Sequence, residues 1–307
     1  MQIYIFNKNR KIIFISIASL IFTYYIISNN FHNLKVCICT IGKNENLYSR
    51  EFVEYYKKYG IDKIFIYDNN DIDGEKFEDS LSDYIKKGFV KIINYRGKSK
   101  MQYPAFNNCY NKNKQIYNWF IFYDMDEYIH LTNFSNIKAF LGRESFNKCN
   151  VIYLNQVIHT DNEQIYYSNK SLFERFPNIY ENGKVLTKII LRGNLSNINF
   201  TNPHVLNINF QCNSFGKIDH LKKEEIKNEY FYYDHFYFKS SEEYLNKLMR
   251  GDAIFGEKRG FKPIWFRVYF SINKISKEKI DFFENKTGMN LSNYRDKLIK
   301  YKRIERK

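Results

Sequence analysis

The chain has few of the residues that define linker-rich or disulfide-rich proteins. Its 307 residues include only 13 Gly and 4 Pro, which excludes a collagen-like or linker-dominated chain. Five Cys are too sparse for a disulfide scaffold, and no two of them stand in a CxxC zinc pair. Hydrophobic residues make up 44% and charged residues 26%, which together indicate a folded globular protein.

Three common motifs are also missing. The chain contains no G-x-x-x-x-G-K-[ST] phosphate loop and no G-x-G-x-x-G dinucleotide fingerprint. It also lacks the G-x-S-x-G turn that carries a nucleophilic serine. A P-loop nucleotide hydrolase, a dinucleotide-dependent enzyme and a serine hydrolase are therefore disfavoured.

Acidic residues are scarce relative to basic ones, which gives a net charge of +15. Such a charge favours a polyanionic partner such as nucleic acid or an anionic membrane. The chain is also rich in Asn, Lys, Ile, Tyr and Phe, whose codons are rich in A and T. Base composition is therefore the preferred explanation of the charge, and the charge alone does not identify a partner. We expect no nucleic-acid partner, and a nucleic-acid binder is the third-ranked interpretation.

Residues 12–27 form an uncharged apolar run that follows Lys8, Arg10 and Lys11. As a helix this run would be roughly 24 Å long, somewhat shorter than the hydrocarbon layer of a membrane. No A-x-A-like cleavage site follows, which favours a retained signal-anchor over a cleaved signal peptide or a buried soluble helix.

The basic residues before the run predict a cytoplasmic N-terminus and a type II membrane protein. This orientation divides the start of the chain into a cytoplasmic segment (1–11), a transmembrane helix (12–28) and a short stem (29–33). The chain beyond the stem would face the Golgi or ER lumen in a eukaryote and lie outside the cell membrane otherwise. Six N-glycosylation sequons are compatible with such exposure and begin at Asn133, Asn169, Asn194, Asn199, Asn285 and Asn290.

Beyond residue 33, short apolar runs alternate with segments of helical periodicity. Strands are predicted at 34–41, 63–67, 89–95 and 119–123, and helices at 46–59, 75–87 and 102–115. This alternation predicts an α/β fold with a mainly parallel sheet, in which ligands bind beyond the carboxyl ends of the strands.

Acidic residues lie at two of these predicted strand ends. Asp124 and Asp126 follow the strand at 119–123, and their spacing places both side chains on one side of the chain. Two such carboxylates suit Mn²⁺ or Mg²⁺ and leave coordination positions open for a diphosphate. Asp68 and Asp73 follow the strand at 63–67 and are candidates to bind a ribose or a base, or else form an ordinary polar turn.

These residues belong to a longer series of ordered motifs. The series resembles the glycosyltransferases of family 92 (DUF23) and of family 2-like proteins. The resemblance covers roughly residues 35–255 and is carried by 40–45 (TIGKNE), 51–56 (EFVEYY), 66–69 (IYDN), 102–109 (QYPAFNNC), 119–129 (WFIFYDMDEYI), 235–244 (HFYFKSSEEY) and 247–251 (KLMRG).

The resemblance implies a GT-A fold and a nucleotide-sugar donor. By that resemblance, Glu45 and Asp68 lie near the base and ribose, and Asp124 and Asp126 hold Mn²⁺ on the diphosphate. His235 matches a late histidine that often reaches the metal in such enzymes, with a buried structural histidine as the alternative. Gln102 matches the family's glutamine, although a polar residue at a helix start needs no special role.

The acceptor half departs from the family pattern at residues 154–161. An inverting transferase needs a carboxylate near the acceptor hydroxyl to remove its proton. Asp161 and Asp234 are the candidates for this base, and Asp219 is a third. Lys188 and Arg192 are candidates to face the phosphates, or alternate outward from a strand.

The sequence thus predicts a membrane-anchored, metal-dependent glycosyltransferase that moves a sugar, expected from a UDP-sugar, to a glycan or glycoconjugate. The alternative is a catalytically silent, membrane-tethered protein of the same fold that binds a glycan or an anion. The predicted catalytic domain covers 34–275, with a nucleotide-sugar half at 34–130 and an acceptor half at 131–275. A basic C-terminal tail is predicted at 276–307.

Overall fold

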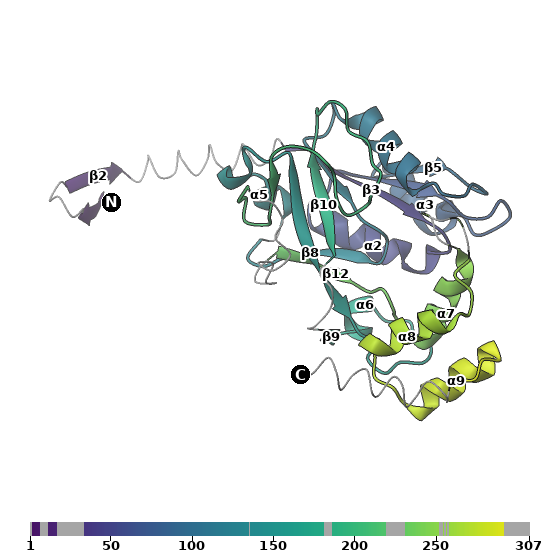
Figure 1. Cartoon of the computed structure of the whole chain (residues 1–307). Helices are drawn as coiled ribbons and strands as arrows, with labels where there is room; N and C mark the ends of the chain where they lie inside the picture. Colours follow the sequence, from purple (N-terminus) through teal and green to yellow (C-terminus); the bar gives the residue numbers. More distant parts are fainter. Residues whose placement is uncertain are drawn as a thin grey trace.

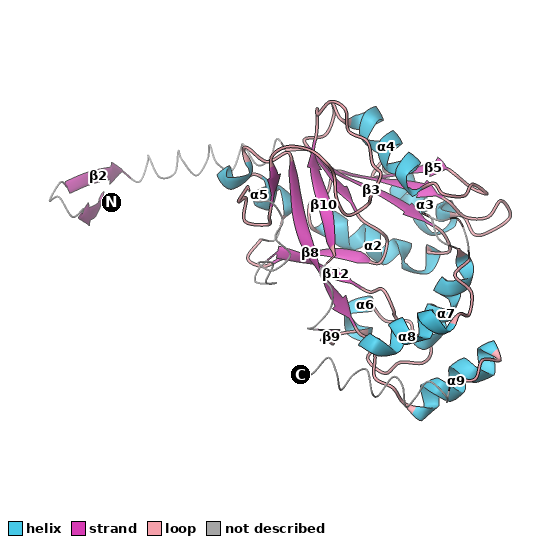
Figure 2. Ribbon diagram, in the orientation of Figure 1, coloured by secondary structure: helices cyan, strands magenta, loops and turns pink. Residues whose placement is uncertain are grey.

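The computed structural model describes residues 2–6, 12–16, 34–134, 136–180, 186–218, 231–251, 254, 256 and 258–291. A curled ten-stranded sheet runs through the centre of the molecule (Figures 1 and 2). Its strands are β3 (Val36–Gly42), β4 (Lys63–Asp68), β5 (Val90–Asn94), β6 (Trp119–Phe122), β7 (Glu127–Leu131), β8 (Val151–His159), β9 (Ile179–Tyr180), β10 (Thr187–Arg192), β11 (Gln211–Cys212) and β12 (Phe231–His235).

The two halves of the sheet differ in strand direction. The main path runs β5-β4-β3-β6-β10-β8-β12-β7, and β9 and β11 pair with β8. The first four strands are parallel, as predicted from the alternating runs. From β10 onward the sheet is mixed, because β10 is antiparallel to both β6 and β8 and β12 is antiparallel to β7. The prediction of a mainly parallel sheet is therefore correct only for the N-terminal half.

Helices pack on both faces of the sheet, and α7 (Ser241–Arg250) lies beside the carboxyl ends of β3 and β6. The helices described are α2 (Asn46–Lys58), α3 (Phe77–Lys86), α4 (Gln102–Asn113), α5 (Ile137–Leu141), the 3₁₀ turn η1 (Glu144–Phe146), α6 (Leu172–Arg175), α7, α8 (Pro263–Ile272) and α9 (Lys277–Thr287). The predicted helices at 46–59, 75–87 and 102–115 correspond to α2, α3 and α4. Gly60 and Gly88 lie just beyond α2 and α3 with positive φ angles, the backbone conformation that commonly ends a helix.

Side-chain alternation in the buried strands divides the core into two layers. On β3, Val36 and Ile38 belong to the layer that includes α2 and α3, whereas Cys39 and Ile41 belong to the layer that includes α4. A strand buried on both faces shows no polar alternation, which is why 34–41 appears as a continuous apolar run.

A third apolar cluster joins α7, α8 and α9, which gather together in Figure 1. Ile280, Phe282 and Phe283 of α9 are buried in this cluster. The folded body therefore continues through the first part of the predicted tail at 276–307, because α9 has an apolar face to bury. Residues 292–307 lie outside the described residues.

The N-terminal segment differs in part from the predicted transmembrane helix. Residues 12–16 form strand β2 (Ile12–Ser16), which pairs antiparallel with β1 (Gln2–Phe6). An apolar run rich in Ile fits a strand as readily as a helix. Residues 17–28, the rest of the predicted span, lie outside the described residues. Within the described part of the chain, no helix is both long and apolar enough to cross a membrane.

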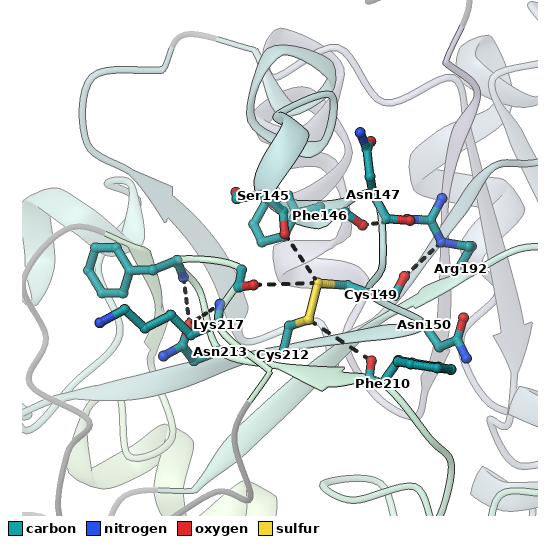
Figure 3. Close-up of a disulfide and its surroundings, with 12 residues drawn as sticks. Ser145, Phe146, Asn147, Cys149, Asn150, Arg192, Phe210, Cys212, Asn213 and Lys217 are labelled. Atoms are coloured by element: carbon teal, nitrogen blue, oxygen red, sulfur yellow. Dashed lines mark hydrogen bonds between the residues drawn. A yellow bond between two sulfur atoms is a disulfide. The ribbon is translucent and has the colours of Figure 1, made fainter.

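Two disulfides connect distant parts of the chain, and Cys37 is a buried free thiol. Cys39 of β3 is bonded to Cys109 of α4. Cys149, just before β8, is bonded to Cys212 of β11, with the carbonyls of Ser145 and Phe210 around the sulfurs (Figure 3). The two pairs are separated by 70 and 63 residues, so each closes a long loop.

We expect reduction to destabilise the folded protein strongly. Loops of this length predict about 4 kcal/mol of stabilisation per disulfide from the restricted unfolded chain. Urea unfolding with and without a phosphine reductant measures the effect. A Cys149→Ser/Cys212→Ser double variant serves as the control, since it should respond to reductant about half as strongly. Equal unfolding midpoints for the oxidised and reduced wild type would contradict the expectation.

Candidate active site

A cavity of about 290 Å³ opens at the carboxyl ends of β3 and β6. The end of β3 contributes Ile41 and Gly42, and the turn after β6 contributes the acidic segment 124–127. Helix α7 and the segment after it supply cations to the same cavity, among them Lys247, Arg250 and Arg259. The predicted ligand-binding edge of the sheet is thus a cavity that combines carboxylates with basic side chains.

Asp124 is held by partners from two other elements. Gln102, at the start of α4, donates from Nε2 to Asp124 Oδ1 at 3.0 Å. The buried Lys188 of β10 lies with Nζ 2.7 Å from Asp124 Oδ2 and 3.0 Å from Glu127 Oε2. The other amide atom of Gln102, Oε1, is buried without a hydrogen-bond partner among the described residues. Gln102 and Lys188 therefore both lie at the predicted acidic centre.

Asp126 is buried and paired with a lysine from α7. Lys247 Nζ lies 2.7 Å from Asp126 Oδ2 and donates to the Tyr237 carbonyl at 3.1 Å. Burial alone would raise the pKa of Asp126, but the combined attraction of neighbouring basic groups, with Lys247 foremost, outweighs it and holds that pKa well below its usual range. Asp126 is consequently a carboxylate at neutral pH.

Asp126, Glu127 and His235 form a group whose ligand atoms all lie within 4.8 Å of one another. His235 Nε2 is 3.7 Å from Asp126 Oδ1 and 3.8 Å from Glu127 Oε1, while its Nδ1 lies 3.1 Å from Gln156 Oε1. The antiparallel register of β12 on β7 places His235 directly opposite Glu127. Two carboxylates and an imidazole that is oriented by the Gln156 amide fit a divalent cation such as Mn²⁺.

Burial is the main influence on the protonation of His235 and Glu127. It lowers the pKa of His235 to about 3, so the imidazole is neutral and its Nε2 can act as a ligand. Burial also raises the pKa of Glu127 to about 8, opposed by Lys188 and reinforced by the neighbouring carboxylates of Asp124 and Asp126. A bound cation would favour the ionised form of Glu127.

Glu45 lines the same cavity and is surrounded by cations. It forms an ion pair with Arg250, and its Oε2 lies 3.6 Å from Lys239 Nζ. Arg250 also donates to the carbonyl of Lys43 at 3.1 Å. These contacts connect α7 to the loop after β3, so both walls of the cavity are fixed to each other.

Asp68 and Asp73, the other predicted nucleotide contacts, do not line this cavity. Asp68 is buried, with Oδ2 2.8 Å from Arg96 Nη1 and Oδ1 accepting from the Asn70 backbone N–H at 3.0 Å. Asp73 is exposed in the turn that follows β4. The described contacts therefore give Asp68 a part in ordering the loop after β4.

The candidate bases Asp161 and Asp234 also lie outside the cavity lining. Asp161 is buried between Lys279 and Tyr269, and contacts both of them. Asp234 Oδ1 lies 2.8 Å from His159 Nε2, and its Oδ2 lies 3.4 Å from His130 Nδ1. Asp234 must face away from His235 because adjacent residues of a strand point to opposite sides.

Of the remaining candidates, Arg192 does not line the cavity and lies at the opposite end of β10 from Lys188, beside the first residue of β6. Its guanidinium stacks 4.3 Å from the Trp119 ring centroid and donates to the carbonyls of Phe146 and Cys149. Asp219 lies outside the described residues. Sequence reasoning missed Glu127, Lys239, Lys247 and Arg250, although the last two stand at i and i+3 in the KLMRG motif.

Comparison with known proteins identifies the family. Residues 32–259 match the family model described as Glycosyltransferase family 92. The chain belongs to glycosyltransferase family 92. The resemblance seen in the ordered motifs is thereby confirmed.

Individual members of the family match over shorter stretches. A family 92 protein of Ricinus communis is 28% identical over 126 residues, which are 41% of this chain and 22% of that protein. One from Arabidopsis thaliana is 31% identical over 100 residues, which are 31% of this chain and 16% of that protein. The chain thus spans about a fifth of the length of the curated relatives it matches.

Solved structures of glycosyltransferases give weak matches. Residues 1–349 of S. aureus TarS, in complex with UDP, match at a TM-score of 0.39 and 13% identity, over 85% of this chain and 74% of that one. The mannosyltransferase PcManGT from Pyrobaculum calidifontis, in complex with GDP-Man and Mn²⁺, matches at 0.31 and 7% identity, over 44% and 42%. Scores this low carry no inference about ligand or mechanism.

Proposed function

We propose that this family 92 protein is a membrane-anchored, metal-dependent glycosyltransferase that moves a sugar from a nucleotide-sugar to a glycan or glycoconjugate. The observation that carries the proposal is the convergence of Asp126, Glu127 and His235 in a cavity that also presents Lys247 and Arg250. This combination supplies ligands for a divalent cation and cations for a diphosphate in one place.

The chain's own residues would share the work as follows. Asp126, Glu127 and His235 would hold Mn²⁺ or Mg²⁺, which when bound supplies positive charge to the diphosphate leaving group. Lys247 and Arg250 would face the phosphate oxygens from α7. Gln102 and Lys188 fix the orientation of Asp124. Gln102 Oε1, which has no hydrogen-bond partner among the described residues, would accept a hydrogen bond from an N–H or O–H group of the ligand.

Two further observations support a location in the secretory pathway or outside the cell. Disulfides such as Cys39–Cys109 persist in oxidising compartments and are rare in the cytosol. All six sequon asparagines are exposed on the described surface. Both observations agree with the type II orientation that we propose for the N-terminal anchor.

Calorimetric titration of the full chain in detergent tests the proposal. We expect UDP to bind in the presence of Mn²⁺ and to lose most of its affinity when the metal is chelated. GDP is titrated in parallel, because the base of the donor nucleotide is a separate question. A folded wild type that binds neither nucleotide would refute the donor site and favour the silent binding protein.

A further inference from the structure

The cavity of the candidate active site is the first of three adjacent cavities. It shares Tyr237, Lys247 and Arg250 with a second cavity of about 210 Å³. The second shares Leu47, Tyr48 and Tyr167 with a third of about 700 Å³. Because each cavity shares lining residues with the next, the three lie side by side in a row, which is called the groove below. It leads from the acidic centre along one side of α7 and then between α2 and the segment 167–175.

The floor of this groove is fixed by a buried polar network. Tyr48 donates from its hydroxyl to Glu243, and Glu243 forms a buried ion pair with Arg175 of α6. Lys239 Nζ lies 3.8 Å from the Tyr48 ring centroid. Three elements distant in sequence thus meet beneath the groove, and a binding surface held in this way needs little ordering when a ligand arrives.

Exposed apolar and neutral polar side chains lie among the charged residues of the groove walls. Leu47 is 55% exposed and Tyr167 is 36% exposed, and both line the two outer cavities. Asn246 and Asn169 add amide groups. Exposed apolar groups rimmed by polar ones mark ligand grooves. This pattern fits a sugar chain, whose rings present apolar C–H faces and whose edges present hydroxyls.

The charges along the groove favour an uncharged ligand. The two outer cavities are lined by six carboxylates and seven basic groups, although the whole chain carries a net charge of +15. Several of these charges already pair within the protein, such as Arg50 with Glu54 at 3.0 Å and Arg175 with Glu243. A polyanion would find no field of one sign here.

We propose that this groove binds the acceptor as an extended, neutral oligosaccharide of three or more sugars. The end of the oligosaccharide that receives the new sugar lies in the candidate active-site cavity. The remaining sugars lie over Tyr48, Leu47 and Tyr167. This inference rests on the proposed glycosyltransferase function and specifies its acceptor class.

The test uses an array of immobilised neutral oligosaccharides of one to six sugars, with sulfated heparin fragments of the same lengths. The fluorescently labelled full chain is applied in detergent with UDP and Mn²⁺. Its N-glycans are first removed enzymatically under non-denaturing conditions, because the sequon residue Asn169 lines the third cavity. Tyr167→Ala and Leu47→Ser each remove one exposed contact. Tyr166→Ala is the matched control, since Tyr166 is 62% exposed but packs on Phe282 and lines neither outer cavity.

We expect at least one neutral series to bind more strongly from one sugar to three or more. Tyr167→Ala and Leu47→Ser should each weaken binding of the longer members at least fivefold, while Tyr166→Ala changes it less than twofold. Binding without length dependence, preference for heparin fragments, or no effect of Tyr167→Ala and Leu47→Ser would overturn the proposal. UDP affinity, measured in parallel, separates the two hypotheses: its absence refutes the donor site, whereas intact UDP binding without glycan binding refutes only the groove.

Discussion

Replacing Asp126 by Asn is expected to lower glycosyl transfer by about 100-fold or more, the scale on which buried active-site electrostatic contacts act. Asp126 Oδ2 lies 2.7 Å from Lys247 Nζ, and Oδ1 is 3.7 Å from His235 Nε2. The amide keeps the size of the side chain but removes the charge that pairs with Lys247 and that would bind the proposed metal. Metal-dependent UDP binding, measured by calorimetry, should be lost in parallel.

The same substitution also leaves the partly buried Lys247 without its carboxylate, a change that costs up to about 3–5 kcal/mol of folding free energy when the pair is fully buried. An Asp126→Asn/Lys247→Met double variant therefore separates stability from function. It should recover most of the urea stability and remain unable to bind UDP with metal. Asp62→Asn, which removes a carboxylate paired with Lys138 outside the cavity, should keep UDP binding within twofold of wild type. A stable Asp126→Asn protein with full activity would refute the metal role.

The local parts of this site could be predicted from the sequence because each depends on short-range rules. The apolar run at 119–123 forms β6 and delivers Asp124 and Asp126 to the edge of the sheet. Adjacent strand residues alternate in direction, so the pairing of His235 with the metal group already implied that Asp234 faces elsewhere. This alternation alone argues against placing both Asp234 and His235 in one site.

The contacts across the fold could not be predicted in the same way. Lys247 and Asp126 are 121 residues apart, and only the packing of α7 beside the turn after β6 brings them together. Glu127 becomes a candidate ligand only through the register of β12 on β7, which places it opposite His235. Register depends on the whole sheet and is not written in either strand alone.

The pairing of Lys247 with Asp126 leads to the second large effect. We expect Lys247→Met to bind Mn²⁺ at least tenfold more tightly than wild type when no nucleotide is present. The ammonium of Lys247 pairs with Oδ2 of Asp126, a proposed metal ligand. Two unit positive charges 4 Å apart repel each other by about 4 kcal/mol at an effective dielectric constant of 20, so removing the ammonium should strengthen Mn²⁺ binding. Titration of the full chain with Mn²⁺ alone, followed by calorimetry, measures the change.

The same variant should bind UDP with Mn²⁺ more weakly, because Lys247 is also a proposed partner of the diphosphate. Opposite shifts in the two affinities are what an exchange of Lys247 from Asp126 to the phosphates requires, since a simple loss of structure would weaken both. Lys43→Met is the matched control: Lys43 lines the same cavity but pairs with Asp71, so Mn²⁺ affinity should change less than twofold. If Lys247→Met leaves Mn²⁺ affinity unchanged, or if both variants raise it equally, Lys247 does not compete with the metal for Asp126.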